Sequence, residues 1–308
     1  MDKRNSVSKE ITHVTGNQTN SNRVSIKLSP KPSYQPQASG VNIEAEIYQF
    51  ARLRQLSLTQ RLEMLIAHER GVKKLCLAGI KLRHPGATLE EIRYRFTRAV
   101  LAQKYREDFY PTGNNEQMWI QDSITLAGEL HQIFESMKIA YYVSGGVAAS
   151  LHGEPRSTRD LDLVIEIQPE AIDLLVTTLE QARYYCPAGA VEGLKQRKEN
   201  VLNITNTETI ANADIYISDV SAFSSSQMER RQLIDTEGMP KFWVASAEDT
   251  ILQKLRWGKT SQSEKQWRDV LGILKLQAEN LDYGYLAQWA ESLDLIDDFS
   301  QALTQAGL

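Results

Sequence analysis

Two aspartates at the start of an apolar run offer the chemistry of a metal site. Asp160 and Asp162 alternate with Leu161, Leu163 and Ile165. Successive side chains of a β-strand point to opposite faces, so the two carboxylates would share one face while the apolar side chains enter a core. Mg²⁺ prefers oxygen ligands and is usually held by one or two carboxylates together with water and substrate phosphates. The pattern therefore indicates a site for Mg²⁺ or Mn²⁺, and its alternative is an Asp-x-Asp pair that only ends a strand.

A glycine pair precedes this acidic strand and indicates a place for phosphate. Residues 140–143 are strand-like, Ser144, Gly145 and Gly146 form a turn, and residues 147–152 resemble a short helix. Glycine allows a phosphate to approach the backbone closely, and the start of a helix offers unpaired N–H groups to an anion. Phosphate on one side and metal on the other is the combination that phosphoryl transfer needs.

The whole stretch 144–165, SGGVAASLHGEPRSTRDLDLVI, resembles the signature of the polymerase-beta-like nucleotidyltransferase superfamily. Among its members, the chain is most similar to the AbiEii-type and related minimal bacterial nucleotidyltransferases. The resemblance covers roughly residues 120–275. It implies that the turn 144–146 faces a nucleoside triphosphate and that Asp160 and Asp162 hold metal. It also implies an α+β fold, in which helices flank a mixed β-sheet.

Members of this family carry a third acid on a later strand, and Asp214 matches its usual position. Asp214 enters the apolar run 211–217, ANADIYI. A third carboxylate beside the metal can accept the proton of an attacking hydroxyl. The alternative is a solvent-facing aspartate at a strand end. Asp219 is the local competitor, but it lies past the strand and fits less well.

A helix is predicted to begin at Ser246, where Ser246 and Asp249 form the pattern of an N-terminal capping box. In the AbiEii-type relatives a similar helix carries a lysine near the active site. The resemblance thus implies that Lys254 contacts substrate phosphate and that Asp269 orders the basic group. A solvated charged face explains Lys254 equally well and is the favoured interpretation of Asp269.

Two arginines precede the acids and are predicted to steer a triphosphate toward them. Arg156 and Arg159 supply positive charge at this approach. In the alternative interpretation they pair with Glu154 or with the aspartates. His152 is interpreted as a structural hydrogen-bonding residue, because Mg²⁺ favours oxygen over imidazole.

Other kinds of site are not supported by the sequence. Cys76 and Cys186 stand far apart, which argues against a zinc motif or a disulfide framework and fits a reducing compartment. No Gly-x-Ser-x-Gly elbow of a serine hydrolase is present. No apolar run approaches the roughly 20 residues that span a bilayer, and the N-terminus lacks a signal-like apolar region. We therefore expect a cytoplasmic protein with no membrane partner.

Charge is distributed unevenly along the 308 residues, whose net charge is −4. Residues 1–110 carry 19 Lys and Arg against 10 Asp and Glu, whereas residues 111–308 carry 16 against 29. The basic excess of the first segment is suited to RNA or another acidic partner, although it is diffuse.

Composition divides the chain into four segments. Residues 1–42 are polar with no apolar period and are predicted to be a disordered tail. Residues 43–110 are predicted to form a helical module, residues 111–245 the nucleotidyltransferase core, and residues 246–308 a C-terminal helical segment. With 42% hydrophobic residues, the chain is able to build a sizeable core.

The predicted elements follow from periodicity within these segments. Apolar residues recur at helical spacing over 58–80, residues 84–86 break the run, and Thr88 with Glu91 forms a capping box for a second helix. Further helices are expected at 117–137 and 170–184 and from Ser263 and Tyr283 onward. Residues 200–205 and 210–217 are expected to pair as adjacent strands.

These observations lead to a functional hypothesis. The chain is expected to transfer a nucleotidyl group from a nucleoside triphosphate to a hydroxyl of RNA (such as tRNA), of a protein or of a small molecule, with Mg²⁺ or Mn²⁺ as cofactor. A role in a toxin–antitoxin or phage-defence system, with a cognate antitoxin, belongs to the same hypothesis. The rival is a catalytically inactive binding module, or antitoxin-like partner, that keeps the fold.

Overall fold

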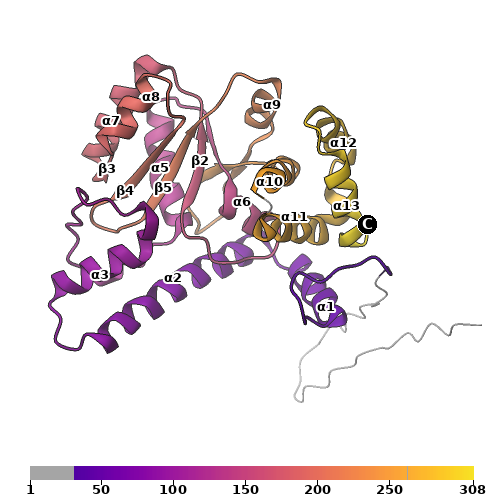
Figure 1. Ribbon diagram of the computed structural model, residues 1–308, viewed down its shortest axis with the longest axis horizontal. Helices are drawn as coiled ribbons and strands as arrows, with labels where there is room; N and C mark the ends of the chain where they lie inside the picture. Colours follow the sequence, from indigo (N-terminus) through magenta and orange to yellow (C-terminus); the bar gives the residue numbers. More distant parts are fainter. Residues whose placement is uncertain (1–30, 262) are drawn as a thin grey trace, which may run out of the picture.

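One mixed β-sheet lies at the centre of the computed structural model, which describes residues 31–261 and 263–308 (Figure 1). The strand order is β3-β4-β5-β2-β1-β7-β6. The pairs β2–β5 and β1–β7 are parallel, whereas the remaining neighbours are antiparallel. The strands are β1 (Tyr141–Val143), β2 (Leu161–Ile165), β3 (Tyr184–Tyr185), β4 (Val201–Asn206), β5 (Asn212–Ile217), β6 (Gln232–Ile234) and β7 (Phe242–Val244). The α+β prediction with a mixed sheet is confirmed.

Alternation along β2 separates the core from the acidic face, as predicted. Leu161, Leu163 and Ile165 are fully buried, whereas Asp162 between them stays partly exposed. Each buried aliphatic side chain contributes roughly 1.5–3 kcal/mol to folding. These side chains belong to a large apolar cluster that includes residues of α5 (Ser123–Ser136), α7 (Ile172–Gln181) and α8 (Ala188–Lys195). Figure 1 shows α7 and α8 beside β3 and β4.

The C-terminal helices form a second apolar cluster against α6 (Gly145–His152). They are α10 (Ala247–Ser261), α11 (Glu264–Gln277), α12 (Tyr283–Ser292) and α13 (Ile296–Ala306). Both α10 and α11 contact α6 directly. The helix α6 begins at Gly145, two residues before the predicted start at residue 147, so both glycines of the predicted turn lie in its first turn. This packing brings the charged residues of α10 and α11 to the back of that glycine turn.

The N-terminal helices divide between two neighbours. The helix α1 (Ile43–Arg54) packs on α11, whereas α2 (Leu58–Arg83) and α3 (Leu89–Leu101) form a hairpin. The hairpin shares an apolar cluster with Trp119 and Ile210 of the core. The capping box of Thr88 and Glu91 at the start of α3 is confirmed. A 3₁₀ turn, η1 (Ala102–Lys104), follows α3.

The single helix expected over residues 117–137 is a wrong prediction, because the segment forms α4 (Glu116–Trp119) and then α5. Asp122 causes the break: its side chain accepts a hydrogen bond of 2.9 Å from the Thr125 N–H and so caps α5. Asp122 is also paired with Arg70 of α2 at 2.7 Å. A buried aspartate with these partners starts a new helix.

Several smaller elements were not predicted, namely β3, β6, β7, α8 and α9 (Ala222–Arg230). The expected strand pair is confirmed as β4 and β5, which are antiparallel neighbours. The helix expected at 170–184 is shorter in the structure, because the 3₁₀ turn η2 (Pro169–Ala171) precedes it and α7 ends at Gln181. Another 3₁₀ turn, η3 (Ala278–Asn280), follows α11. None of the described helices combines the length and the apolar character needed to cross a membrane.

Part of the predicted tail 1–42 lies outside the described residues, which begin at residue 31. Residues 31–42 form no helix or strand. They nevertheless contact the folded chain, because the Tyr34 hydroxyl and the Gln37 N–H both donate hydrogen bonds to the Glu46 carboxylate, at 2.7 and 2.6 Å.

Candidate functional site

The structure brings Asp160, Asp162 and Asp214 together on one face of the sheet. Asp162 and Asp214 are direct partners in the parallel pair β2–β5, so their side chains share a face. Asp160 immediately precedes β2. The Oδ2 atoms of Asp160 and Asp214 both contact the ammonium group of Lys104. Three carboxylates from two neighbouring strands thus form one acidic cluster.

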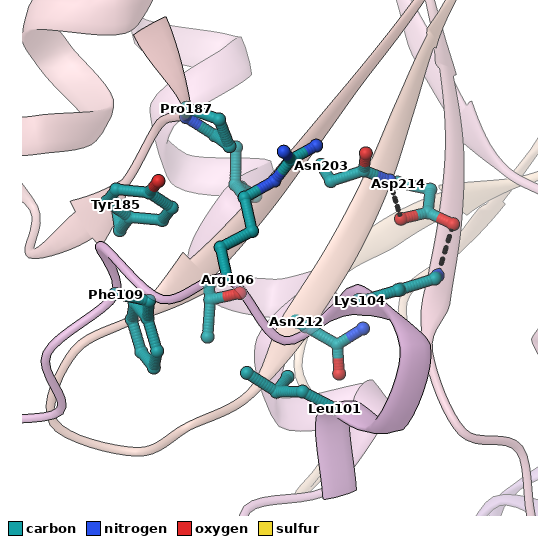
Figure 2. A pocket seen from close by; sticks show the side chains of 11 residues that line it. Leu101, Lys104, Arg106, Phe109, Tyr185, Pro187, Asn203, Asn212 and Asp214 are labelled. Carbon is teal, nitrogen blue, oxygen red and sulfur yellow. Dashed lines mark hydrogen bonds and ion pairs between the residues drawn. The ribbon is translucent and has the colours of Figure 1, made fainter. Parts of the chain in front are cut away.

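Two polar residues of this cluster were missed by sequence reasoning. The Asn203 side chain on β4 donates a 2.6 Å hydrogen bond to Oδ1 of Asp214, and Lys104 contacts the other oxygen (Figure 2). Asn203 lies opposite Asp214 in the antiparallel pair β4–β5. The strand pair was predicted, but its register was not, so Asn203 was not identified as the partner of Asp214. Lys104 had no local signal, because it ends the short 3₁₀ turn η1 and belongs to no acidic or glycine-rich pattern.

The glycine turn is built around Asp162. Gly145 has φ +59°, and a Cβ there would lie 1.9 Å from Oδ2 of Asp162. The Gly146 N–H points at the same oxygen at 3.4 Å, while the Ser144 N–H donates to the Asp162 carbonyl at 2.8 Å. The start of α6 therefore faces the acidic cluster, and only glycine fits at position 145.

Replacing Gly145 by alanine is expected to destabilise the protein by about 1–3 kcal/mol, because the new Cβ displaces Asp162 and the left-handed backbone is strained. Urea unfolding measures the change. Gly189→Ala on α8 is the matched control, since a Cβ there meets no atom within 4 Å. Equal stability of the two variants would contradict this view of the turn.

Asp162 holds its proton more tightly than an ordinary aspartate. Burial, followed by the neighbouring Asp160 and Asp214 carboxylates, raises the pKa of Asp162 to about 6, despite the opposing effects of Lys104 and the Gly146 N–H. Burial, followed by the carboxylates of Asp162, Asp214 and Asp160, raises the pKa of Tyr216, two residues beyond Asp214 on β5. The cluster therefore carries uncompensated negative charge at neutral pH.

This raised pKa predicts a pH-dependent difference between the protein and its Asp162→Asn variant. Since the folded-state pKa exceeds the unfolded value, ionisation of Asp162 disfavours the folded state above about pH 6. In the presence of a chelator the variant should be more stable by about 1–3 kcal/mol at pH 7.5. The difference in unfolding free energy between the two proteins should disappear as the pH falls from 6 toward 4, because protonated Asp162 no longer destabilises the folded state. Thermal unfolding of both proteins across this pH range measures the difference. A difference that does not change with pH would contradict the raised pKa of Asp162.

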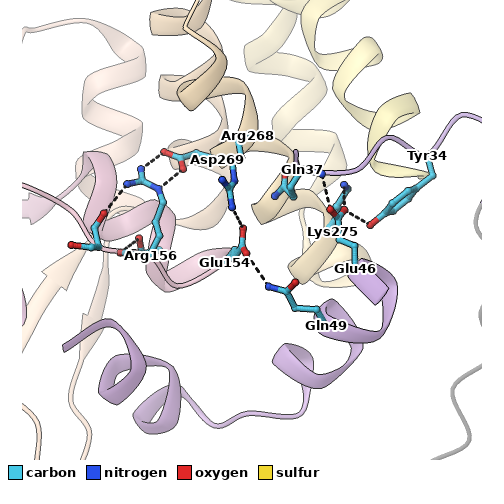
Figure 3. A network of polar contacts seen from close by, with 11 residues as sticks. Tyr34, Gln37, Glu46, Gln49, Glu154, Arg156, Arg268, Asp269 and Lys275 are labelled. Carbon is cyan, nitrogen blue, oxygen red and sulfur yellow. Dashed lines mark hydrogen bonds and ion pairs between the residues drawn. The ribbon is translucent and has the colours of Figure 1, made fainter. Parts of the chain in front are cut away.

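Behind the glycine turn, Asp269 holds two basic groups. The Lys254 ammonium lies 2.9 Å from Oδ2 of Asp269, and both side chains are 5% exposed. Arg156 makes a two-pronged contact with the same carboxylate at 2.8 and 2.6 Å (Figure 3). Burial lowers the pKa of Lys254, against the opposing effect of Asp269. For Asp269, the two cations outweigh the effect of burial and lower its pKa.

The position of Asp269 agrees with its implied role of ordering a basic group, and neither it nor Lys254 lies on a solvated face. Lys254 is close enough to Asp162 for their charges to interact. The alternative interpretation paired Arg156 with Glu154 or with the aspartates of the acidic strand. Arg156 does pair with an acid, but this acid is Asp269 on α11. Glu154 instead pairs with Arg268 at 3.0 Å.

Arg159 is exposed and lines a groove of about 600 Å³ that opens beside Asp160. The groove runs between the hairpin of α2 and α3 and the approach to β2. Lys73 and Lys265 supply further basic groups, while Glu69 and Asp160 supply acidic ones. A ligand that reaches Asp160 from this side meets charges of both signs.

The remaining candidates have structural partners. His152 is buried and makes a 2.7 Å hydrogen bond with the Ala245 carbonyl, which fits its structural interpretation. Asp219 accepts hydrogen bonds from Ser221 and Ser224 at the start of α9. Both cysteines are free thiols.

The donor set of the cluster fits a hard divalent cation, because it consists of carboxylate oxygens around a shared positive charge. The ammonium of Lys104 is itself a cation held by two of these carboxylates. Among the residues that the structure describes, no three His, Cys, Asp or Glu side chains are already arranged as a metal-binding group. The residues therefore suit a cation, while their present arrangement suits an ammonium group.

Comparisons with known proteins add little to this geometry. No protein-family model and no curated protein matches the chain. A solved structure similar to it is that of an antigenic nucleotidyltransferase-like protein from Paracoccidioides brasiliensis, at 20% identity and a TM-score of 0.39. The match covers 59% of this chain and 92% of the other. At this identity and TM-score the likeness assigns no residue and no activity to the chain.

Proposed function

We propose that the protein is a divalent-cation-dependent nucleotidyltransferase of the AbiEii-like type. The single observation that supports this most strongly is the acidic cluster itself. Asp162 and Asp214 are direct neighbours in the strand register, and the ammonium group of Lys104 links Asp160 to Asp214. The helix that starts at Gly145 faces these acids. Carboxylates next to helix amides suit a metal-bound triphosphate.

In this proposal Asp160, Asp162 and Asp214 would hold Mg²⁺ or Mn²⁺. When bound, the cation would neutralise charge on the phosphate oxygens. An acceptor hydroxyl would attack the α-phosphorus as the bond to the leaving pyrophosphate breaks. Asp214 would take the hydroxyl proton, and the Asn203 hydrogen bond to its other oxygen would hold the carboxylate in position.

The basic residues behind the turn would support the triphosphate. A Cβ on Gly146 would lie 3.6 Å from the Arg156 guanidinium, so this charge lies next to the turn. Lys254 is fixed by Asp269 and adds a second positive charge. Because both are preorganised by one carboxylate, their field would reach the turn without rearrangement. We propose that Ser144, Gly145 and Gly146 supply the contacting backbone and that Arg159 guides the anion in.

The acceptor would enter through the groove beside Asp160. Its basic residues suit a phosphate-bearing acceptor such as RNA, including tRNA, and the basic excess of residues 1–110 points the same way. A protein or small-molecule hydroxyl would undergo the same reaction. We place this activity in the cytoplasm, in a toxin–antitoxin or phage-defence system with a cognate antitoxin.

A second candidate function is an inactive module that binds through the same fold. The observation that favours it is Lys104, whose ammonium balances two of the three acids without any metal. Nucleotide affinity separates the candidates. The enzyme should bind a nucleoside triphosphate more tightly with Mg²⁺ than without it, whereas the module should show no such dependence.

The activity itself is tested with two labels. The full chain is incubated with Mg²⁺, cell extract and each nucleoside triphosphate, labelled at either the α- or the γ-phosphate. Nucleotidyl transfer leaves the α-label on an RNA, protein or small molecule and releases the γ-label in pyrophosphate. Transfer of the γ-label would indicate a kinase instead, and no transfer with any nucleotide or metal would overturn the proposal.

A further inference from the structure

Lys104 lies at the position that the proposed cation would need. Its ammonium contacts Oδ2 of Asp160, which precedes β2, and Oδ2 of Asp214 on β5. Figure 2 shows the contact with Asp214. The contact is partly shielded from water, since the side chains of Lys104 and Asp160 are 29% and 26% exposed and that of Asp214 is 8% exposed. It therefore differs from an ordinary surface ion pair, which is screened and weak.

Lys104 is carried by a short segment that joins the hairpin to the core, which we call the strap (residues 101–109). Its two ends, Leu101 and Phe109, are each 2% exposed and belong to one apolar cluster. Phe109 also packs on Tyr185 of β3, with 5.4 Å between ring centroids. Between these anchors most side chains are exposed. The strap thus crosses the acidic face, held at both ends by apolar contacts and at Tyr105 by contacts with Tyr94 and Arg98 of α3.

We propose that the strap is an autoinhibitory element and that Lys104 and the divalent cation compete for Asp160 and Asp214. This inference rests on the proposed function, because it concerns the same cation site. In the closed state described by the structure, the ammonium balances the acids. Binding of the metal expels Lys104 and lifts the strap.

The two cations compete because both would bind the same Oδ2 oxygens of Asp160 and Asp214. Like charges that share two carboxylate oxygens repel strongly in a site with limited water. Departure of the ammonium would free one oxygen on each of two carboxylates.

The backbone of the strap is built to move without unfolding its neighbours. In the described structure its hydrogen bonds are local, from Tyr105 N to Ala102 O at 3.2 Å and from Phe109 N to Arg106 O at 3.1 Å. Ala102 has φ 48°, a conformation that residues with a Cβ rarely adopt. Lifting residues 102–108 therefore breaks no strand pairing and relieves a strained residue.

The test measures Mn²⁺ affinity of the full chain by electron paramagnetic resonance. Lys104→Met removes the charge and keeps most of the side chain, whereas Lys74→Met makes the same change on an exposed residue of α2. If the open state is a minor one, Lys104→Met should bind Mn²⁺ at least about tenfold more tightly than the wild type. Lys74→Met should match the wild type. Equal or weaker binding by Lys104→Met would overturn the inference.

Hydrogen exchange of the wild type provides a second readout that depends on no variant. Saturating Mn²⁺ should speed amide exchange in residues 102–108, because the strap lifts. Mn²⁺ binding with unchanged or slower exchange there, and equal affinity in Lys104→Met, would overturn the autoinhibitory role and leave the proposed function standing. Failure of the wild type and of Lys104→Met to bind Mn²⁺ would overturn both.

Discussion

Asp214→Asn is expected to reduce nucleotidyl transfer by at least about 1000-fold, since it removes both a metal ligand and the proton acceptor. The fold should remain intact, because asparagine has nearly the same shape and Asn203 is able to turn its amide to keep a hydrogen bond. Initial rates with α-labelled nucleotide measure the loss, and circular dichroism verifies the fold.

Asp219→Asn is the matched control for this variant. Asp219 follows β5, and in the described structure its side chain hydrogen-bonds only to the Ser221–Ser224 turn at the start of α9, so its variant should keep the wild-type rate within about threefold. Retention of activity by Asp214→Asn, or equal losses in the two variants, would remove Asp214 from the site.

Glu46→Ala is expected to cost about 3–5 kcal/mol of unfolding free energy, because it leaves the buried charge of Lys275 without its carboxylate partner. The carboxylate of Glu46 on α1 and the ammonium of Lys275 on α11 lie 2.6 Å apart, and both side chains are 2% exposed (Figure 3). Tyr34 and Gln37 complete the contacts of Glu46. Guanidinium unfolding measures the effect.

Glu44→Ala serves as the control, because Glu44 is exposed on the same helix and should change stability by no more than about 0.5 kcal/mol. The double variant Glu46→Leu with Lys275→Met should recover most of the loss, since replacing both charges removes the cost of burying one alone. A loss below 1 kcal/mol in Glu46→Ala would show that α1 is not held to α11 by this pair.

Local patterns predicted the acids that the structure brings together. Asp162 alternates with buried Leu161 and Leu163 because side chains of a strand point to opposite faces in turn, and the sequence shows this alternation directly. Position 214 was found because the family resemblance called for a third acid on a later strand, and Asp214 enters such an apolar strand. The turn before α6 was readable because glycine at 145 has a stereochemical cause.

Contacts between distant segments escaped prediction for a physical reason. Lys104 is 56 residues from Asp160 and 110 from Asp214, and the meeting depends on how the hairpin docks through its apolar cluster. The pair of Glu46 and Lys275 is separated by 229 residues. Apolar periodicity predicts local elements and does not predict which residues so far apart in the sequence meet in the fold. The break before α5 was missed because the capping by Asp122 was overlooked within an apolar run.

The most direct test of the proposed cation site is a crystal structure with Mn²⁺ and a non-hydrolysable nucleoside triphosphate. The acidic cluster should show an anomalous Mn²⁺ signal bound by carboxylate oxygens of Asp160, Asp162 and Asp214, with the triphosphate at the turn of residues 144–146. Lys104 should have left the two carboxylates. Mn²⁺ and nucleotide bound elsewhere, with Lys104 still between Asp160 and Asp214, would contradict the account.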